Sequence, residues 1–151
     1  MKFTREITNG FIIFAGIAIY FAIMELLGLS DVFILRIFNV FIIAYGINRT
    51  ISANIHDGIR GYFRNFISGF ITSMIGAILS ILSLLIYIEI RGGEEFLKHL
   101  SEAFLIGGGD VDSSTYVIAL LLLESSAASL VATFVLMQYW KDKAEVINKV
   151  D

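Results

Sequence analysis

The chain has 151 residues, of which 57% are hydrophobic and 17% are charged, with 13 phenylalanines and neither proline nor cysteine. The lack of cysteine excludes disulfides, iron–sulfur clusters and thiolate chemistry, and a net charge of −3 does not favour nucleic-acid binding. Soluble domains average about 25% charged residues, so the composition favours a membrane protein over a soluble helical core.

Four apolar stretches are long enough to cross a bilayer. A helix rises about 1.5 Å per residue, so about 20 apolar residues span a hydrocarbon core roughly 30 Å thick. The predicted spans are residues 11–29, 31–48, 65–90 and 116–140. They predict an all-α polytopic membrane protein, a single antiparallel bundle of four transmembrane helices over residues 1–151.

The basic start before the first span, with Lys2 and Arg5, is also compatible with a secretory signal peptide. The apolar run is longer than a typical signal core, however, and no small-x-small cleavage site ends it. Three further spans follow it. We therefore expect an uncleaved first helix.

The links between the spans differ in length. A tight turn at residues 29–31 makes the first two spans antiparallel neighbours. Residues 49–64 are expected to form a polar link that Gly58 and Gly61 interrupt.

The longest link covers residues 91–115, and glycines bracket its central part. Residues 94–106 place four apolar side chains on one helical face and charged residues away from it. This pattern is typical of a short amphipathic helix on the membrane surface. The apolar residues are Phe96, Leu97, Leu100 and Phe104.

Basic residues are divided unequally between the two sides of the membrane. Four spans place both termini on one side, and loops rich in Lys and Arg stay cytoplasmic. We therefore expect both termini in the cytoplasm and the 91–115 link outside. The terminal side carries Lys2, Arg5, Arg49, Arg60, Arg64, Lys141, Lys143 and Lys149, against Arg36, Arg91 and Lys98 elsewhere.

Small residues recur at helical spacing in the third span. Helices associate in lipid through close packing of small residues, and a repeat averaging 3.5 residues suits a left-handed seam. The simplest interpretation is a packing face. Its residues are Gly69, Ser73, Gly76, Ser80 and Ser83, at intervals of 4, 3, 4 and 3.

Polar side chains inside the other spans predict a buried cluster of Glu25, Arg36, Asn39 and Glu124. Three interpretations stay open. Glu25 and Arg36 can neutralise each other, with Arg36 reaching the interface. The group can instead be a proton or ligand site in which Glu124 titrates, because intramembrane ionisable groups mark pathways. Thirdly, Glu124 can meet a charge of a partner protein.

No catalytic or metal-binding constellation is recognisable. His56 and His99 belong to links on opposite sides of the membrane, so they cannot share a metal ion. Ser125 and Ser126 have no histidine within reach as a base. We expect no enzyme activity, metal or cofactor. An enzyme that acts on lipid at residues 91–115 is kept as the least favoured alternative.

Several segments resemble a family of small, uncharacterised four-span proteins of Bacteroidetes-type bacteria. They are YGINRT at 45–50, HDGIRGY at 56–62, the third span with its small residues, and MQYWK at 137–141. The resemblance covers most of the chain and implies a location in the bacterial inner membrane. It implies no activity and no functional residues.

These observations predict a structural or accessory protein. The expected partners are the lipid bilayer and either a larger membrane complex or further copies of the chain. The alternative is a small proton-linked transporter or channel that uses the Glu25, Arg36 and Glu124 group.

Overall fold

The structure, a computed structural model, describes residues 3–30, 32–93 and 114–144. Every element in these ranges is helical. The predicted amphipathic helix at 94–106 lies outside them. The elements are α1 (Phe3–Leu26), the short 3₁₀ segment η1 (Phe33–Phe38), α2 (Asn39–His56), α3 (Tyr62–Arg91) and α5 (Ser114–Ala144).

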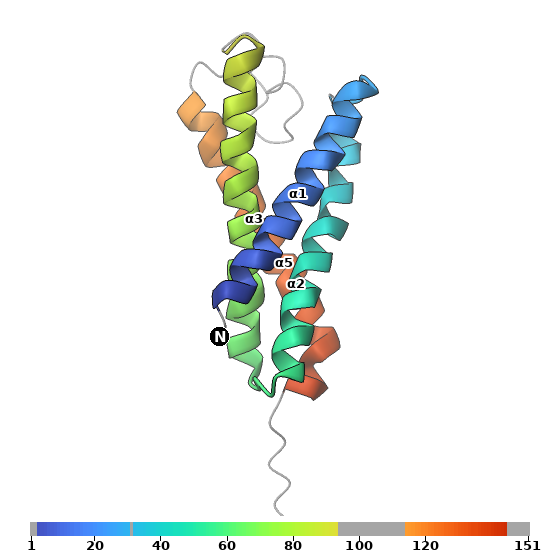
Figure 1. Ribbon diagram of the computed structural model, residues 1–151, viewed down its shortest axis with the longest axis vertical. Helices are drawn as coiled ribbons and strands as arrows, with labels where there is room; N and C mark the ends of the chain where they lie inside the picture. Colours follow the sequence, from blue (N-terminus) through green and yellow to red (C-terminus); the bar gives the residue numbers. More distant parts are fainter. Residues whose placement is uncertain (1–2, 31, 94–113, 145–151) are drawn as a thin grey trace, which may run out of the picture.

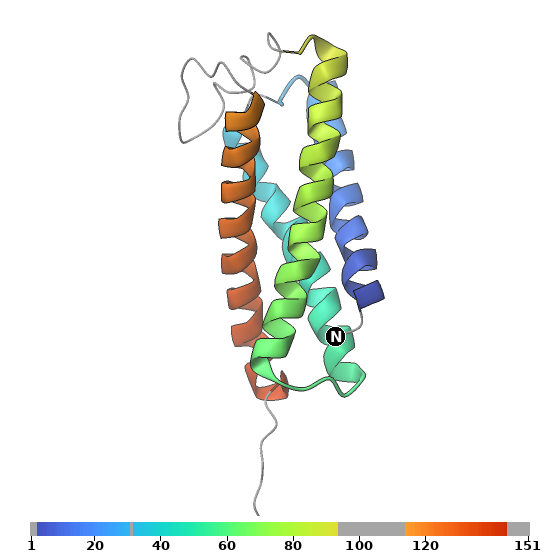
Figure 2. The same ribbon diagram turned by 90° about the vertical axis from the view of Figure 1, so that its left-hand side faces the viewer.

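The helices form an antiparallel bundle in which α1 begins and α5 ends at the same end, here called the terminal end (Figures 1 and 2). The opposite end is called the loop end. Helices α2 and α3 pack against each other and against both α1 and α5. Within the described residues, α1 and α5 make no contact with each other, so they lie on opposite sides of the α2–α3 pair.

Within the described residues, four helices are long and apolar enough to cross a membrane, which confirms the predicted all-α four-helix bundle. The candidate spans are Phe3–Leu26, Ile34–His56, Tyr62–Arg91 and Ile118–Ala144. Large apolar side chains cover the outside of the bundle; Phe41, Ile86 and Val131, for example, are each more than 60% exposed. Such an apolar exterior is typical of a surface that contacts lipid, and the chain is a membrane protein.

The helices extend beyond the predicted spans, most clearly at the second. The predicted polar link 49–64 is wrong, because α2 continues to His56 and only residues 57–61 connect it to α3. The extension is amphipathic: Thr50, Ile51, Asn54 and Ile55 are buried at helical spacing. Likewise α1 begins at Phe3 rather than at residue 11, since Glu6 and Asn9 are buried.

Helices α1, α2 and α3 are each followed by a glycine with positive φ, and the first two show how the turn is made. After α1, Gly28 has φ +66°, and the N–H of Leu29 bonds to the carbonyl of Met24 at 2.9 Å. After α2, Gly58 has φ +73°, and the N–H of Ile59 bonds to the carbonyl of Asn54 at 2.8 Å. This left-handed turn satisfies carbonyls that the helix leaves unpaired, and glycine adopts it without a steric penalty.

Small residues bring α1, α2 and α3 close together around Ile13, which is completely buried. A Cβ atom at Gly46 would lie 2.3 Å from Ile13 Cγ1, and one at Gly76 would lie 2.6 Å from Ile13 Cγ2. Ile13 of α1 therefore occupies a notch that exists only because α2 and α3 each have a glycine there.

The predicted small-residue seam of α3 is only partly an interface. Gly69, Ser73 and Gly76 are buried, whereas Ser80 is half-buried and Ser83 is exposed. The prediction assumed that one face of α3 packs against other helices over its whole length. The part of this face near the terminal end is packed, whereas Ser80 and Ser83, nearer the loop end, are more exposed.

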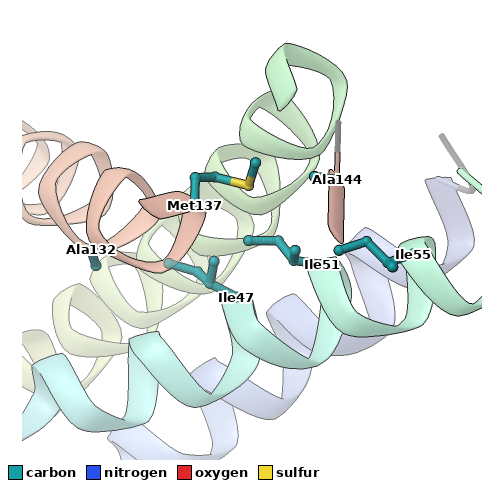
Figure 3. Close-up of a cluster of buried hydrophobic side chains, with 6 residues drawn as sticks. All are labelled: Ile47, Ile51, Ile55, Ala132, Met137 and Ala144. Atoms are coloured by element: carbon teal, nitrogen blue, oxygen red, sulfur yellow. The ribbon is translucent and has the colours of Figure 1, made fainter. Parts of the chain in front are cut away.

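An apolar cluster joins α2 to α5 near the terminal end (Figure 3). Ile47, Ile51 and Met137 are completely buried, and their side chains gather between α2 and α5. Closer to the loop end, Ile81 and Ile88 of α3 pack with Leu121 of α5. These contacts hold α5 against the face of the bundle opposite α1.

Candidate functional site

A network of buried polar side chains joins α1, α2 and α3 at the terminal end. Six of its residues are almost inaccessible to solvent, with exposed fractions of 0–3%. We call it the polar network. Its members are Arg5, Glu6 and Asn9 of α1, Thr50, Asn54 and Asp57 of α2 and its C-terminal cap, and Ser68 and Thr72 of α3.

One chain of hydrogen bonds in the polar network ends on Glu6. Arg5 Nη1 donates to Asn54 Oδ1 at 2.6 Å, and Asn54 Nδ2 donates to Ser68 Oγ at 2.9 Å. The Ser68 hydroxyl then donates to Glu6 Oε1. Each bond in this chain therefore donates toward the carboxylate, which suits an acceptor-only group.

A second chain lies one helical turn away. Asn9 Nδ2 donates to Thr50 Oγ1 at 2.8 Å, and Thr50 Oγ1 lies 3.0 Å from Thr72 Oγ1. Thr72 uses its single hydroxyl proton on the carbonyl of Ser68 at 2.8 Å. A hydroxyl has only one proton to donate, so Thr50 must be the donor to Thr72.

Glu6 is the one completely buried ionisable side chain among the described residues. Its Oε1 accepts from Ser68, but its Oε2 is buried without a hydrogen-bond partner in the described part of the chain. Arg5 forms its ion pair with Asp57.

Aromatic and amide side chains surround the same end of the bundle. Trp140 Nε1 donates to Asn48 Oδ1 at 2.7 Å, and Gln138 Nε2 donates to the Tyr62 hydroxyl at 3.1 Å. Tryptophan and tyrosine are enriched where a membrane meets water. The polar network therefore lies close to the level of this interface, not at the centre of the apolar slab.

A second polar contact joins α1 and α3 at the loop end. Glu25 Oε1 accepts from the Tyr87 hydroxyl at 2.9 Å and from Arg91 Nη2 at 2.6 Å. The Tyr87 ring also meets Phe21 edge-on, with the ring centroids 5.4 Å apart. Glu25 is thus paired across the bundle with α3, and not through the short turn with Arg36 as the sequence suggested.

The predicted cluster of Glu25, Arg36, Asn39 and Glu124 is not assembled. Glu25 lies on α1 and Glu124 on α5, and these helices do not touch within the described residues. They also lie at different depths. Ser126 Oγ is 3.7 Å from Met74 Sδ, so Glu124 is level with the middle of α3, roughly 20 Å from the end at which Arg91 holds Glu25.

Glu124 is exposed on the outer face of α5. It has no hydrogen bond or ion pair with the described part of the chain. Arg36 is half-buried in η1, and Asn39 is half-buried at the start of α2 with a buried Oδ1 that has no described partner. The structure thus places the predicted site residues in three separate environments.

The sequence did not reveal the polar network because six of its eight residues fall before the first predicted span or in the predicted link 49–64. The other two, Ser68 and Thr72, fall in the third span but outside its predicted small-residue face. A signal was present, however. Polar residues recur one helical turn apart in each of three segments: Glu6 and Asn9, Thr50 and Asn54, and Ser68 and Thr72. Such spacing places them on one face of each helix.

The fold and these polar contacts define a polytopic membrane protein with an all-α four-helix bundle. No protein-family model matches the chain, and no curated protein or solved structure is significantly similar to it. The resemblance to small four-span bacterial proteins therefore stays a prediction. In residues 3–30, 32–93 and 114–144, no group of three or more His, Cys, Asp or Glu could hold a metal ion.

Proposed function

We propose that this chain is a structural or accessory protein that acts by assembling in the membrane, with a larger complex or with further copies of itself. The observation that carries the proposal is Glu124, an exposed carboxylate level with the middle of the bundle. A charge facing lipid is costly, and intramembrane charges are normally paired with another polar group. A partner helix supplies that group.

The other polar groups support the same proposal. Glu25, Tyr87 and Arg91 bond to one another between α1 and α3 at the loop end, and Asn9, Thr50 and Thr72 join α1, α2 and α3 at the terminal end. Each of these hydrogen bonds joins two helices of the bundle, which is a structural role. Association is therefore a better-supported role than catalysis.

We propose further that the protein resides in the inner membrane of a bacterium with both termini in the cytoplasm. The support is the distribution of basic residues, since positively charged segments remain on the cytoplasmic side. Arg5, Arg60, Arg64, Lys141 and Lys143 belong to the ends of helices or links at the terminal end.

The test is purification of the tagged protein in a mild detergent, with measurement of the mass of the particle and identification of its components. A stoichiometric assembly that persists in Glu124→Gln and dissociates in Glu124→Leu is the expected result. A monomer without partners, equally stable in both variants, would contradict the proposal.

A second candidate function, a proton-linked carrier or channel, is favoured by one observation. Glu6 is completely buried at the contact of three helices, and its Oε2 has no partner within the described residues. Ionisable residues inside transmembrane segments commonly mark ion and proton pathways. In this candidate Glu6, rather than Glu124, is the proton-binding group.

Proton flux into proteoliposomes distinguishes the two candidates. A carrier or channel requires a flux in the unmodified protein that is lost in Glu6→Gln and kept in Glu25→Gln. The glutamine is isosteric, and its amide oxygen still accepts from Ser68, so the bundle should remain folded. The absence of flux in the unmodified protein would remove this candidate.

A further inference from the structure

An open hollow of about 480 Å³ lies on the outward face of α2, in the half nearer the terminal end (Figure 1). We call it the α2 hollow. The buried residues of α2, such as Thr50 and Asn54, lie on the opposite face of the helix, so the hollow opens away from the bundle. Its volume is within the range of small-molecule sites, roughly 300–1,000 Å³. Its lining residues are Tyr45, Asn48, Arg49, Ser52, Ala53, His56 and Asp57.

Side chains of α1 and α5 reach the two edges of the α2 hollow. Asp57, at one edge, forms an ion pair with Arg5 of α1. Asn48, at the other edge, accepts a hydrogen bond from Trp140 of α5 at 2.7 Å, and Lys143 Nζ lies 4.8 Å from the centre of the Trp140 ring. Tryptophan is enriched where a membrane meets water. The hollow therefore lies at that level, with a cation beside each edge.

The α2 hollow contains three hydrogen-bond donors that the described part of the chain does not use. They are the guanidinium of Arg49 and the hydroxyls of Tyr45 and Ser52, each one helical turn from Arg49. The acidic lining residue, Asp57, is paired with Arg5 and not with Arg49. An arginine is always charged and binds phosphate oxygens through two parallel N–H groups. These donors therefore suit a phosphate group.

The same face of the chain becomes apolar away from the terminal end. Beyond Tyr45 it continues with Phe41 and Phe38, which are 68% and 52% exposed, with their ring centroids 6.1 Å apart. Phe41 lies about 12 Å along the helix from Arg49. A phospholipid has the same order of groups, a phosphate at the interface followed by acyl chains. A soluble phosphate would make no use of the apolar part.

We propose that the α2 hollow binds an anionic phospholipid of the surrounding bilayer. Arg49 binds the lipid phosphate, and the hydroxyls of Tyr45 and Ser52 donate to its oxygens. The acyl chains lie along Phe41 and the aromatic side chain before it. Basic pockets between transmembrane helices are binding sites for anionic lipid head groups. This inference goes beyond the proposed function, because it needs neither a partner protein nor a second copy of the chain.

The charges at the two edges select the type of lipid. Arg5 and Lys143 repel the ammonium group of a zwitterionic head group such as that of phosphatidylcholine. The head group of phosphatidylglycerol is uncharged beyond its phosphate, so it avoids this repulsion. The expected occupant is therefore a lipid of the phosphatidylglycerol type.

Trp140 provides the measurement, because it is the one tryptophan of the chain and bonds to the edge of the α2 hollow. The full chain is placed in phosphatidylcholine vesicles that contain a minor share of phosphatidylglycerol. Bromine, which quenches tryptophan fluorescence, is carried near the head of the acyl chains by the phosphatidylglycerol or by the same amount of phosphatidylcholine. Brominated phosphatidylglycerol should quench more strongly, corresponding to about fivefold preferential binding for one basic residue.

Two arginine variants test whether the preference belongs to the α2 hollow. Arg49→Gln should abolish the extra quenching, whereas Arg64→Gln, an exposed arginine of α3 at the same end, should retain it. Arg49 is exposed, so its replacement should leave the fold intact, and circular dichroism checks this. Equal quenching by the two lipids in the unmodified protein would overturn the inference. So would extra quenching that persists in Arg49→Gln, or that falls equally in both variants.

A soluble competitor distinguishes a lipid from a free phosphate ester. Glycerol phosphate has the phosphate without the acyl chains, so it should not relieve the quenching by brominated phosphatidylglycerol. Relief of the quenching would assign the α2 hollow to a soluble phosphate ester and overturn the inference.

The proposed assembly and the lipid site can fail separately. Glu124→Leu should leave the lipid preference unchanged, because Glu124 lies on another helix and nearer the middle of the bundle. A lipid preference in a protein that is monomeric and without partners overturns only the assembly role. A stoichiometric complex with equal quenching by the two lipids overturns only the lipid site.

Discussion

Ser68 of α3 donates its hydroxyl proton to Oε1 of Glu6 of α1, although 62 positions separate the two residues in the sequence. Ser68 also accepts a hydrogen bond from Asn54 of α2 at 2.9 Å. One hydroxyl therefore connects three helices. Its two bonds fix the relative register of α1, α2 and α3 at the terminal end.

Replacement of Ser68 by alanine should destabilise the bundle by about 1–3 kcal/mol, because it leaves Glu6 Oε1 and Asn54 Nδ2 buried without partners. Unfolding in detergent micelles measures the effect. Ser83→Ala, an exposed serine of the same helix, is the matched control and should change little. Equal stability of the two variants would show that the Ser68 bonds contribute nothing.

The notch around Ile13 predicts that alanine is too large at Gly46. A Cβ atom there would lie 2.3 Å from Ile13 Cγ1, and overpacking of this kind costs about 1–3 kcal/mol. The same unfolding assay applies. Combining Gly46→Ala with Ile13→Ala should cost less than the sum of the single changes, because the alanine removes both Cγ1 and Cδ1, the two atoms that would clash. Strict additivity would contradict a direct clash.

The hydrogen bond from Tyr87 to Glu25 predicts a measurable loss in Tyr87→Phe. Removing the hydroxyl should cost about 0.5–1.5 kcal/mol, the usual net value of such a bond. Tyr45→Phe is the control, since Tyr45 is 58% exposed on the outer face of α2. A double-mutant cycle with Arg91→Gln should show coupling, because both residues bind the same oxygen of Glu25.

The fold predicts that residues at the two ends of the bundle are reached from opposite sides of the membrane. Single cysteines at Thr4 and Lys141, both exposed at the terminal end, should be labelled together by an impermeant reagent. Cysteines at Leu27 and Ile90, exposed at the loop end, should be labelled only from the other side. Labelling of Thr4 and Lys141 from different sides would rule out this topology.

In the proposed cytoplasmic orientation, the Thr4 and Lys141 cysteines react only after the cells are permeabilised. The Leu27 and Ile90 cysteines react in intact spheroplasts. The reverse pattern would keep the four-span fold and reject the orientation that the basic residues predict.

The number of helices, their approximate positions and their antiparallel order follow from the sequence by itself. The length and apolar character of each segment are local properties, and they decide whether a stretch can cross a bilayer. The glycines at 28 and 58 also mark helix ends through a local requirement, a left-handed backbone. The spacing of small residues likewise predicted the part of the α3 packing face from Gly69 to Gly76, which is buried.

Only the tertiary structure decided which helix faces meet. Periodicity describes each helix alone, so it grouped Glu25, Arg36 and Glu124 into one buried cluster without showing that α1 and α5 lie on opposite sides of the α2–α3 pair. Packing between distant segments instead buried Glu6 against Ser68 and left Glu124 facing outward. A buried polar side chain is stable only when its hydrogen-bond partner is also in place. Here the partners lie on different helices, so packing between segments distant in the sequence decides whether the bond can form.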